Sequence, residues 1–248
     1  MSYLVNLAVE GRPAVVVGAG SVARRKVEGL LRAGASVTVV APAACPEIEA
    51  LATAGGIALR REAYERAHLA GAFLAIAATD DEAVNAQVAQ DARSLGVLVN
   101  VVDRPALCTF TLTASLRRGD LILAVATGGR CPTLARAIRE ELEARYGPEY
   151  AEVVALLGRV REKLIARGWE SARIRRALEQ IYRAGLPELI ASGDRGGIGK
   201  LLEGFRAQDL VEELGSGRPA PPGYAWPRNI SQPRPNRKAR KPAKQYRP

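Results

Sequence analysis

A glycine turn near the N-terminus has the residue types and spacing best suited to chemistry. Gly18, Gly20 and Ala23 fit the pattern GxGxxG/A, directly after a Val-rich apolar run and at the start of a helical stretch. In this pattern the first glycine allows a tight turn, the second lets the backbone approach a pyrophosphate, and the small third residue permits close helix packing. Free amides at the start of a helix attract anions. We therefore predict dinucleotide binding here, against the alternative of a bare structural turn.

Polar residues also follow two later apolar runs. Thr79 and Asp80 come after the fourth run, and Asp103 ends the fifth. The carboxyl ends of parallel strands meet at one edge of a sheet, so these residues are expected beside the glycine turn, in a ligand-binding crevice. Asp103 is placed to take a proton as a hydride leaves, but a loop-capping role explains its position equally well. Thr79 and Asp80 are candidates for cofactor contacts, although Asp80 and Asp81 are also explained as helix caps.

These residues need a parallel sheet to position them. Continuous apolar runs alternate with helical stretches over the first part of the chain, which predicts right-handed crossovers and a doubly wound α/β domain. The expected strands are 13–18, 36–40, 57–59, 73–78 and 97–102, and the expected helices are 21–33, 47–54 and 81–95.

The alternation ends near residue 110. Two strands without a helix between them are expected at 109–113 and 121–126, joined by a turn at 117–120. Helices are expected at 132–145, 152–168, 172–184 and 198–214. We divide the chain into segments 1–113, 114–148, 149–214 and 215–248.

Two loops leave alternatives open. The second strand ends in Val40-Ala41-Pro42-Ala43, without the carboxylate that usually binds the adenosine ribose, so backbone groups of Pro42 and Ala43 are expected to line that pocket. The choice between NAD and NADP stays open. A second glycine turn, Thr127 to Pro132, precedes a helix and is as consistent with a plain turn as with an anion site.

Composition excludes several classes of protein. The formal charge of +10 lies almost wholly in residues 215–248, which hold nine basic residues, no acidic one and eight of the 15 prolines, so we expect a disordered tail. His68 is the only histidine, and the three cysteines form no CxxC pair, so no metal site is expected. No apolar run is long enough to span a membrane and the first residues do not resemble a signal peptide, so we expect a cytoplasmic protein.

Four segments together resemble one known family. GAGSVARRK, LAIAATDDEAVN, NVVDRP and VATGGRCPTLARAIREELE occur in the order and at the spacing of sirohaem synthases. The resemblance is to their precorrin-2 dehydrogenase, which is often also a sirohydrochlorin ferrochelatase, and it covers residues 1–150 well. It implies an α/β protein with a Rossmann-type doubly wound parallel sheet, followed by a small β-plus-helix dimerisation region at 114–148 and a C-terminal helical domain at 149–214.

The resemblance also implies a reaction and a set of residues. The reaction is NAD-dependent oxidation of precorrin-2 to sirohydrochlorin in sirohaem biosynthesis, carried out by a homodimer, and some members also insert ferrous iron. Asp103 matches the essential aspartate of the family, which favours catalysis over loop capping. The NAD contacts of the family fall on Ser21, Val22, Pro42 and Ala43.

Cationic partners are expected for the carboxylates of such a substrate. Arg104, Arg130 and Arg136 lie in or beside the matched segments, and Thr127 keeps a hydroxyl where the family often has serine, so these four residues are candidate substrate contacts. For any single arginine, an ordinary solvated surface charge is the favoured interpretation.

Two other classes of function remain as alternatives. A non-catalytic NAD-sensing regulatory module would use the same glycine turn without needing Asp103. A nucleic-acid binder would act through the basic tail, but few aromatic residues interleave with its charges, and we expect no nucleic-acid partner.

Overall fold

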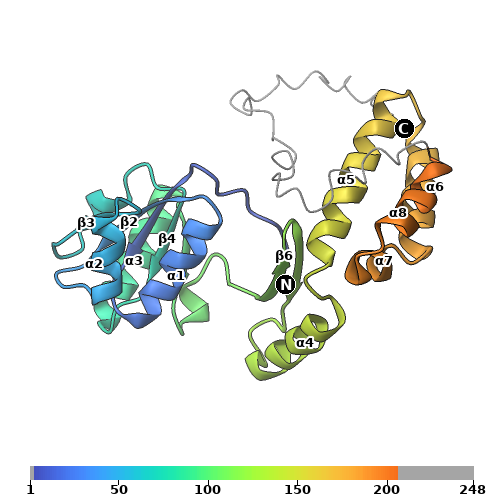
Figure 1. Ribbon diagram of the computed structural model, residues 1–248. Helices are drawn as coiled ribbons and strands as arrows, with labels where there is room; N and C mark the ends of the chain where they lie inside the picture. Colours follow the sequence, from blue (N-terminus) through green and yellow to red (C-terminus); the bar gives the residue numbers. More distant parts are fainter. Residues whose placement is uncertain (1–2, 206–248) are drawn as a thin grey trace, which may run out of the picture. The chain divides into compact units, whose positions relative to one another are not determined.

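The computed structural model describes residues 3–205, and its N-terminal part is built on a five-stranded parallel sheet (Figure 1). The strand order is β3-β2-β1-β4-β5, with β1 at the centre. The strands are β1 (Pro13–Val17), β2 (Ser36–Val40), β3 (Ala58–Arg60), β4 (Leu74–Ala77) and β5 (Leu98–Val101). The chain moves outward from β1 to β3 and then crosses back to β4, which makes the doubly wound topology predicted from the sequence.

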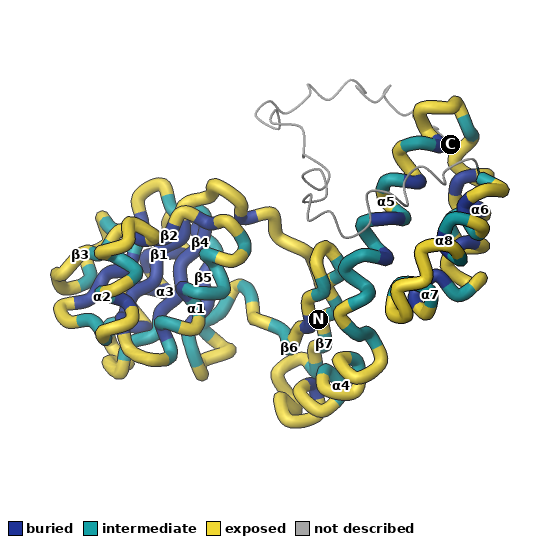
Figure 2. The backbone as a smooth tube through the Cα atoms, in the orientation of Figure 1, coloured by how far each residue is buried: buried dark blue, intermediate teal, exposed yellow. Residues whose placement is uncertain are grey.

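Alternate residues of β1 pack into two different layers. Ala14 and Val16 face one hydrophobic cluster, and Val15 and Val17 face the other. The first cluster includes side chains of α1 (Ser21–Arg32) and α2 (Pro46–Thr53), and the second includes side chains of α3 (Glu82–Leu95) and a short 3₁₀ helix, η1 (Arg66–Leu69). Burial on both faces explains the continuous apolar sequence of the central strands (Figure 2).

One expected strand is absent. Residues 109–113 form no strand, and the hairpin instead pairs β6 (Ala114–Arg118) with β7 (Leu121–Val125). Thr109 explains the difference, because its backbone N–H donates to Val99 O at 2.8 Å and its hydroxyl accepts from Val99 N–H at 2.7 Å. The first residue of the alternating sequence TFTLT therefore binds the outer edge of β5 instead of starting a strand of its own.

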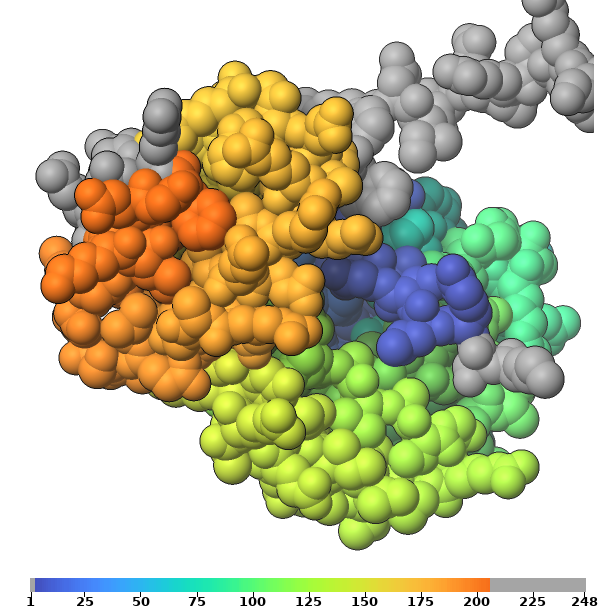
Figure 3. Space-filling view, turned by 90° about the vertical axis from the view of Figure 1, so that its right-hand side faces the viewer, coloured from blue at the N-terminus to red at the C-terminus, as the bar shows by residue number. Residues whose placement is uncertain are grey.

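The C-terminal helices have a core of their own. They are α4 (Pro132–Arg145), α5 (Tyr150–Ala166), α6 (Ser171–Arg183), α7 (Leu186–Ser192) and α8 (Arg195–Glu203). Apolar side chains of α5 to α8 pack into one buried cluster that includes Leu156, Ile181 and Leu202. Figure 3 shows the outer surface of these helices in gold and orange. The helix expected at 198–214 starts earlier, at Arg195, and ends earlier, at Glu203, while residues 206–214 of the expected range lie outside the described chain.

The described chain divides into two compact units. One contains residues 3–114 and Ala124–Arg139, and the other contains Ser115–Leu123 and residues 140–205. The finer division at residues 113, 148 and 214 stays a prediction, and the basic tail at 215–248 lies outside the described residues. No helix in the described part is long and apolar enough to cross a membrane.

A buried carboxylate on α3 binds the segment between β3 and η1. Asp91 on α3 is only 5% exposed, and it accepts hydrogen bonds from the hydroxyl of Tyr64 at 3.0 Å and from the amide of Gln87 at 3.1 Å. Burial, and next the hydrogen bond to Asp91, raises the pKa of Tyr64, which keeps its hydroxyl protonated as a donor.

We expect Tyr64→Phe to lower the free energy of unfolding by about 1–3 kcal/mol, because a buried carboxylate loses a hydrogen-bond donor. Urea denaturation followed by circular dichroism measures the loss. Tyr3→Phe is the matched control, since Tyr3 is 90% exposed. Equal stability of the two variants would show that the Tyr64 hydroxyl contributes nothing.

Candidate active site

The first glycine of the turn is required by a close backbone approach. Gly18 has a φ of 104° and donates its N–H to Val40 O at 2.9 Å. A Cβ at this position would lie 2.4 Å from the carbonyl oxygen of Ala78, in the turn after β4. The glycine turn therefore lies directly against the end of β4, as the sequence predicts for a parallel sheet.

The second glycine leaves open space in front of helix α1. Gly20 is the N-cap of α1, and a Cβ added to it would meet nothing within 4 Å. No side chain caps the first turn of α1, and that turn has no acidic residue. Its free amides and the open approach fit a pyrophosphate, so Gly18 to Val22 could hold a dinucleotide. Individual contacts of Ser21 and Val22 stay predictions.

The loop after β2 is tied to the same turn. Cys45 donates its backbone N–H to Ala19 O at 3.0 Å, which brings the loop with the exposed residues Pro42 and Ala43 beside the glycine turn. The first acidic residue after β2 is Glu47, in the first turn of α2. Hydrogen bonds from its own backbone, and then from Cys45, lower the pKa of this carboxyl, which keeps it ionised at neutral pH.

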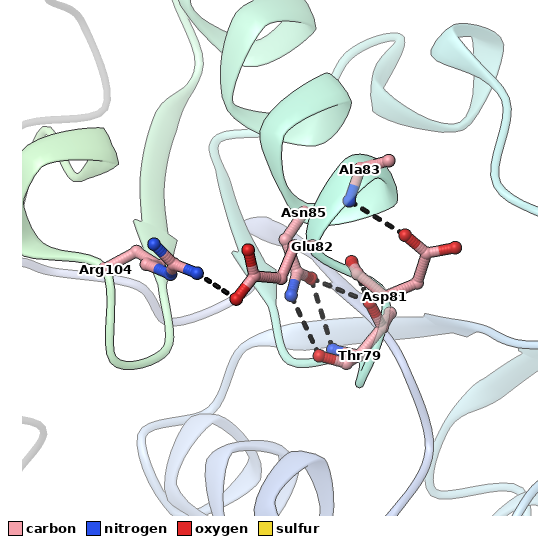
Figure 4. A network of polar contacts seen from close by, with 6 residues as sticks. All are labelled: Thr79, Asp81, Glu82, Ala83, Asn85 and Arg104. Atoms are coloured by element: carbon pink, nitrogen blue, oxygen red, sulfur yellow. Dashed lines mark hydrogen bonds and ion pairs between the residues drawn. The ribbon is translucent and has the colours of Figure 1, made fainter.

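A buried asparagine that sequence reasoning missed organises the turn after β4 (Figure 4). Asn85 is 8% exposed; its Nδ2 donates to Thr79 O at 2.8 Å, and its Oδ1 accepts from Thr79 N–H at 3.2 Å. The Thr79 hydroxyl lies 2.9 Å from the same Oδ1. Asn85 lies with Val88 and Ala89 on the buried face of α3, so the helical period of the sequence was the signal from which its burial could have been predicted.

The two aspartates of this turn have different surroundings. Asp81 is the N-cap of α3 and accepts from the N–H groups of Ala83 at 2.8 Å and Val84 at 3.2 Å. This confirms the capping interpretation for Asp81. Asp80 is exposed, and its cofactor contact, like that of Thr79, stays a prediction.

We expect Asn85→Ala to weaken dinucleotide binding by about three- to ten-fold, because the Thr79 backbone that packs on Gly18 loses its side-chain support. Calorimetric titration with NAD measures this change. Gln90→Ala is the control, since Gln90 is an exposed residue of the same helix. Unchanged affinity in the Asn85 variant would show that the turn keeps its shape without the amide.

Asp103 has an unusual backbone conformation. It follows the end of β5 with a φ of 58°, and among residues 3–205 it is the one non-glycine residue with positive φ. Aspartate tolerates this left-handed region better than most residues, and such conformations cluster at functional sites. The carboxylate is exposed, at the carboxyl edge of the sheet that also carries the glycine turn.

Arg104 makes an ion pair that was not expected. Its guanidinium binds the carboxylate of Glu82, at the start of α3 (Figure 4). The pair links the loop after β5 to the helix after β4, and both side chains are exposed. Its role as a substrate contact stays a prediction, and the structure assigns it this additional local role.

The second glycine turn is organised within itself. Gly128 and Gly129 have φ values of 63° and 77°, and the hydroxyl of Thr127 accepts from the N–H of Cys131 at 3.2 Å. The hydroxyl of Thr127 thus closes the turn that precedes α4, and its contact with substrate stays a prediction. Arg130 and Arg136 are exposed, and their contacts with substrate stay predictions.

No group of three metal-ligating side chains occurs among the described residues. The arrangement that remains is a dinucleotide turn, a rigid β4–α3 turn and a carboxylate at one edge of a parallel sheet. Such an edge can bind a nicotinamide cofactor and place a proton acceptor near it.

Comparisons with known proteins agree with this arrangement. Residues 5–114 match the NAD(P)-binding family NAD_binding_7. A siroheme synthase of Nitrosospira multiformis is 40% identical over 198 residues, which is 78% of this chain and 42% of that protein. Siroheme synthase 1 of Aeromonas salmonicida is 38% identical over 211 residues, 84% of this chain and 45% of that protein. The chain thus spans less than half the length of these relatives.

A solved structure has a similar fold over nearly its whole length. It is described as SirC, precorrin-2 dehydrogenase, with a TM-score of 0.67 and 27% sequence identity. The match covers 83% of this chain and 99% of that one. The likeness therefore includes the C-terminal helices as well as the dinucleotide-binding part.

Proposed function

The chain belongs to the family that comprises precorrin-2 dehydrogenases and the corresponding N-terminal module of sirohaem synthases, and from this premise we propose that it oxidises precorrin-2 to sirohydrochlorin with NAD. The observation that carries the proposal is that an open, uncapped glycine turn and an exposed aspartate both lie at the carboxyl edge of the sheet. A regulatory module would need the first feature and not the second.

Each group of candidate site residues has a separate role in the proposed reaction. When bound, a nicotinamide cofactor accepts a hydride from the substrate. The amides of Ser21 and Val22 would hold the pyrophosphate, and Thr79 and Asp80, after the neighbouring strand, would border the cofactor. Asp103 accepts the proton that the substrate loses as the hydride leaves, so one C–H bond yields a hydride and a second hydrogen leaves as a proton. Arg104, Arg130, Arg136 and Thr127 contact the substrate in this proposal.

NAD suits the loop after β2 better than NADP does. NADP-binding sites usually place an arginine near the 2′-phosphate. Residues 41–45 carry no cation, and Glu47 follows with an ionised carboxylate that would repel a phosphate.

The protein is further proposed to act as a cytoplasmic homodimer, with precorrin-2 as its small-molecule partner. Large apolar side chains are exposed in and beside the β6–β7 hairpin and α4, namely Leu112 at 54%, Ile122 at 37% and Leu134 at 51%. Exposed apolar side chains of this kind favour association between copies.

Anaerobic incubation of the purified protein with precorrin-2 tests the function. With NAD added, we expect the absorbance of sirohydrochlorin and that of NADH to rise together. With NADP in place of NAD, we expect sirohydrochlorin to form much more slowly. A parallel reaction with ferrous or cobaltous ion tests metal insertion by the loss of free sirohydrochlorin. NAD binding without any turnover would overturn the dehydrogenase proposal in favour of the regulatory module.

A further inference from the structure

The free edge of β5 is closed by side chains rather than by another strand. Because β5 is the last strand in the sheet order, the N–H groups of Val99 and Val101 on its outer side have no strand to bind. Val99 N–H donates to the hydroxyl of Thr109 at 2.7 Å, and Val101 N–H donates to the thiol sulfur of Cys108 at 3.1 Å. Two consecutive side chains thus replace a sixth strand.

The thiol of Cys108 also spans the turn that contains Asp103. Its sulfur lies 3.3 Å from Val101 O and 3.4 Å from Arg104 O, close enough for the S–H to donate to either carbonyl. Val101 O also accepts from Arg104 N–H at 3.3 Å. These two carbonyls belong to residues that precede and follow Asp103 in the chain. By bonding to them, the thiol closes the turn in which Asp103 has its positive φ.

Neighbouring contacts fix the position of the thiol itself. The amide Nδ2 of Asn100 lies 3.6 Å from the sulfur and donates to Phe110 O at 3.0 Å. Asn100 is 8% exposed, so this amide belongs to the buried part of the edge. Cys108 is therefore held both from the strand before Asp103 and from the segment after it.

We propose that Cys108 is a positioning residue for Asp103: its thiol holds the turn from Val101 to Arg104 in the conformation that presents the Asp103 carboxylate at the sheet edge. The proposal rests on the proposed function, in which Asp103 accepts a proton. A left-handed conformation of a non-glycine residue needs such external support. Cys108 is half-buried and acts through the backbone, and it does not itself contact the substrate.

A set of matched variants separates positioning from stability. We expect Cys108→Ala to lower kcat for precorrin-2 oxidation by about ten- to a hundred-fold, while KM and NAD affinity stay within about two-fold, because a misplaced base slows chemistry more than binding. Cys108→Ser keeps a donor and an acceptor and should recover most of the rate. Thr109→Val removes the neighbouring cap from the same strand edge and should lower stability without lowering kcat.

A double-mutant cycle with Asp103→Asn provides the decisive comparison. If Cys108 acts through Asp103, adding Cys108→Ala to the Asp103→Asn variant should change the residual rate by less than about two-fold. A full additional loss in that background, or a native kcat in Cys108→Ala beside an inactive Asp103→Asn, would overturn the positioning role and leave the proposed function intact. Native activity of Asp103→Asn would instead overturn the role of Asp103 as base, and with it this inference. If the alanine variant does not fold, Cys108→Val, which is similar in size to cysteine and lacks a donor and an acceptor, takes its place in the cycle with the same expected results.

Discussion

Replacing Asp103 with asparagine is expected to lower kcat by about 10²- to 10⁴-fold, the usual contribution of a positioned general base. Asparagine is preferred to alanine for this test because Asp103 has a φ of 58°, a conformation that asparagine also tolerates. The variant therefore loses the proton acceptor and keeps the turn. Initial rates of NADH formation with precorrin-2 measure the effect.

Two further measurements decide how this result is interpreted. The affinity for NAD should stay unchanged by calorimetric titration, since Asp103 is not part of the glycine turn. Asp120→Asn, at an exposed aspartate in the β6–β7 turn, should keep the native rate. A native rate in the Asp103 variant would mean that the residue only caps its loop, which was the alternative that its position left open.

The elements that could be predicted from the sequence are those in which burial restricts the type of residue. The run from Ala14 to Val17 is buried on both faces of the sheet, so its residues are apolar without interruption, and the helix after the glycine turn follows the helical period. These local constraints are sufficient to predict the order of strands and α-helices within the parallel sheet, from β1 to β5, and the place of the glycine turn, whereas the short helix α7 was not predicted.

Side chains that bind backbone groups were not predictable in the same way. Thr109 lies in an alternating segment typical of a strand, yet its hydroxyl caps the edge of β5. Asn85 and Cys108 likewise bind backbone groups that come close only after the sheet forms. The helical period places Asn85 on the buried face of α3, but it does not identify the backbone groups that such residues bind, because those partners are fixed by tertiary contacts.

The partner of Arg104 illustrates a second limit. An arginine beside a candidate catalytic aspartate suggests a contact with an anionic substrate, which stays a prediction, but the sequence did not indicate that the guanidinium also binds Glu82. The two residues are distant in the sequence and adjacent only because the ends of β4 and β5 are neighbours. Charge alone thus identified a cation near the site without identifying what it binds.

The two glycines of the turn are expected to respond differently to substitution. Gly18→Ala should destabilise the fold, because its φ is 104° and the added Cβ would clash with the Ala78 carbonyl. At Gly20 the backbone is extended, with φ of −83° and ψ of −172°, and an added Cβ meets only open space. Valine adopts that conformation without strain.

Gly20→Val is therefore expected to weaken NAD binding by at least about ten-fold while leaving the free energy of unfolding nearly unchanged, since its side chain would fill the space through which the pyrophosphate reaches the amides of α1. Calorimetric titration with NAD and urea denaturation measure the two quantities on the same preparation. Gly29→Ala, within α1 and away from its N-terminus, is the control and should keep the native affinity. Native affinity in Gly20→Val would mean that the dinucleotide does not bind at this turn, and a parallel loss of stability would mean that the space in front of Gly20 is needed by the fold instead.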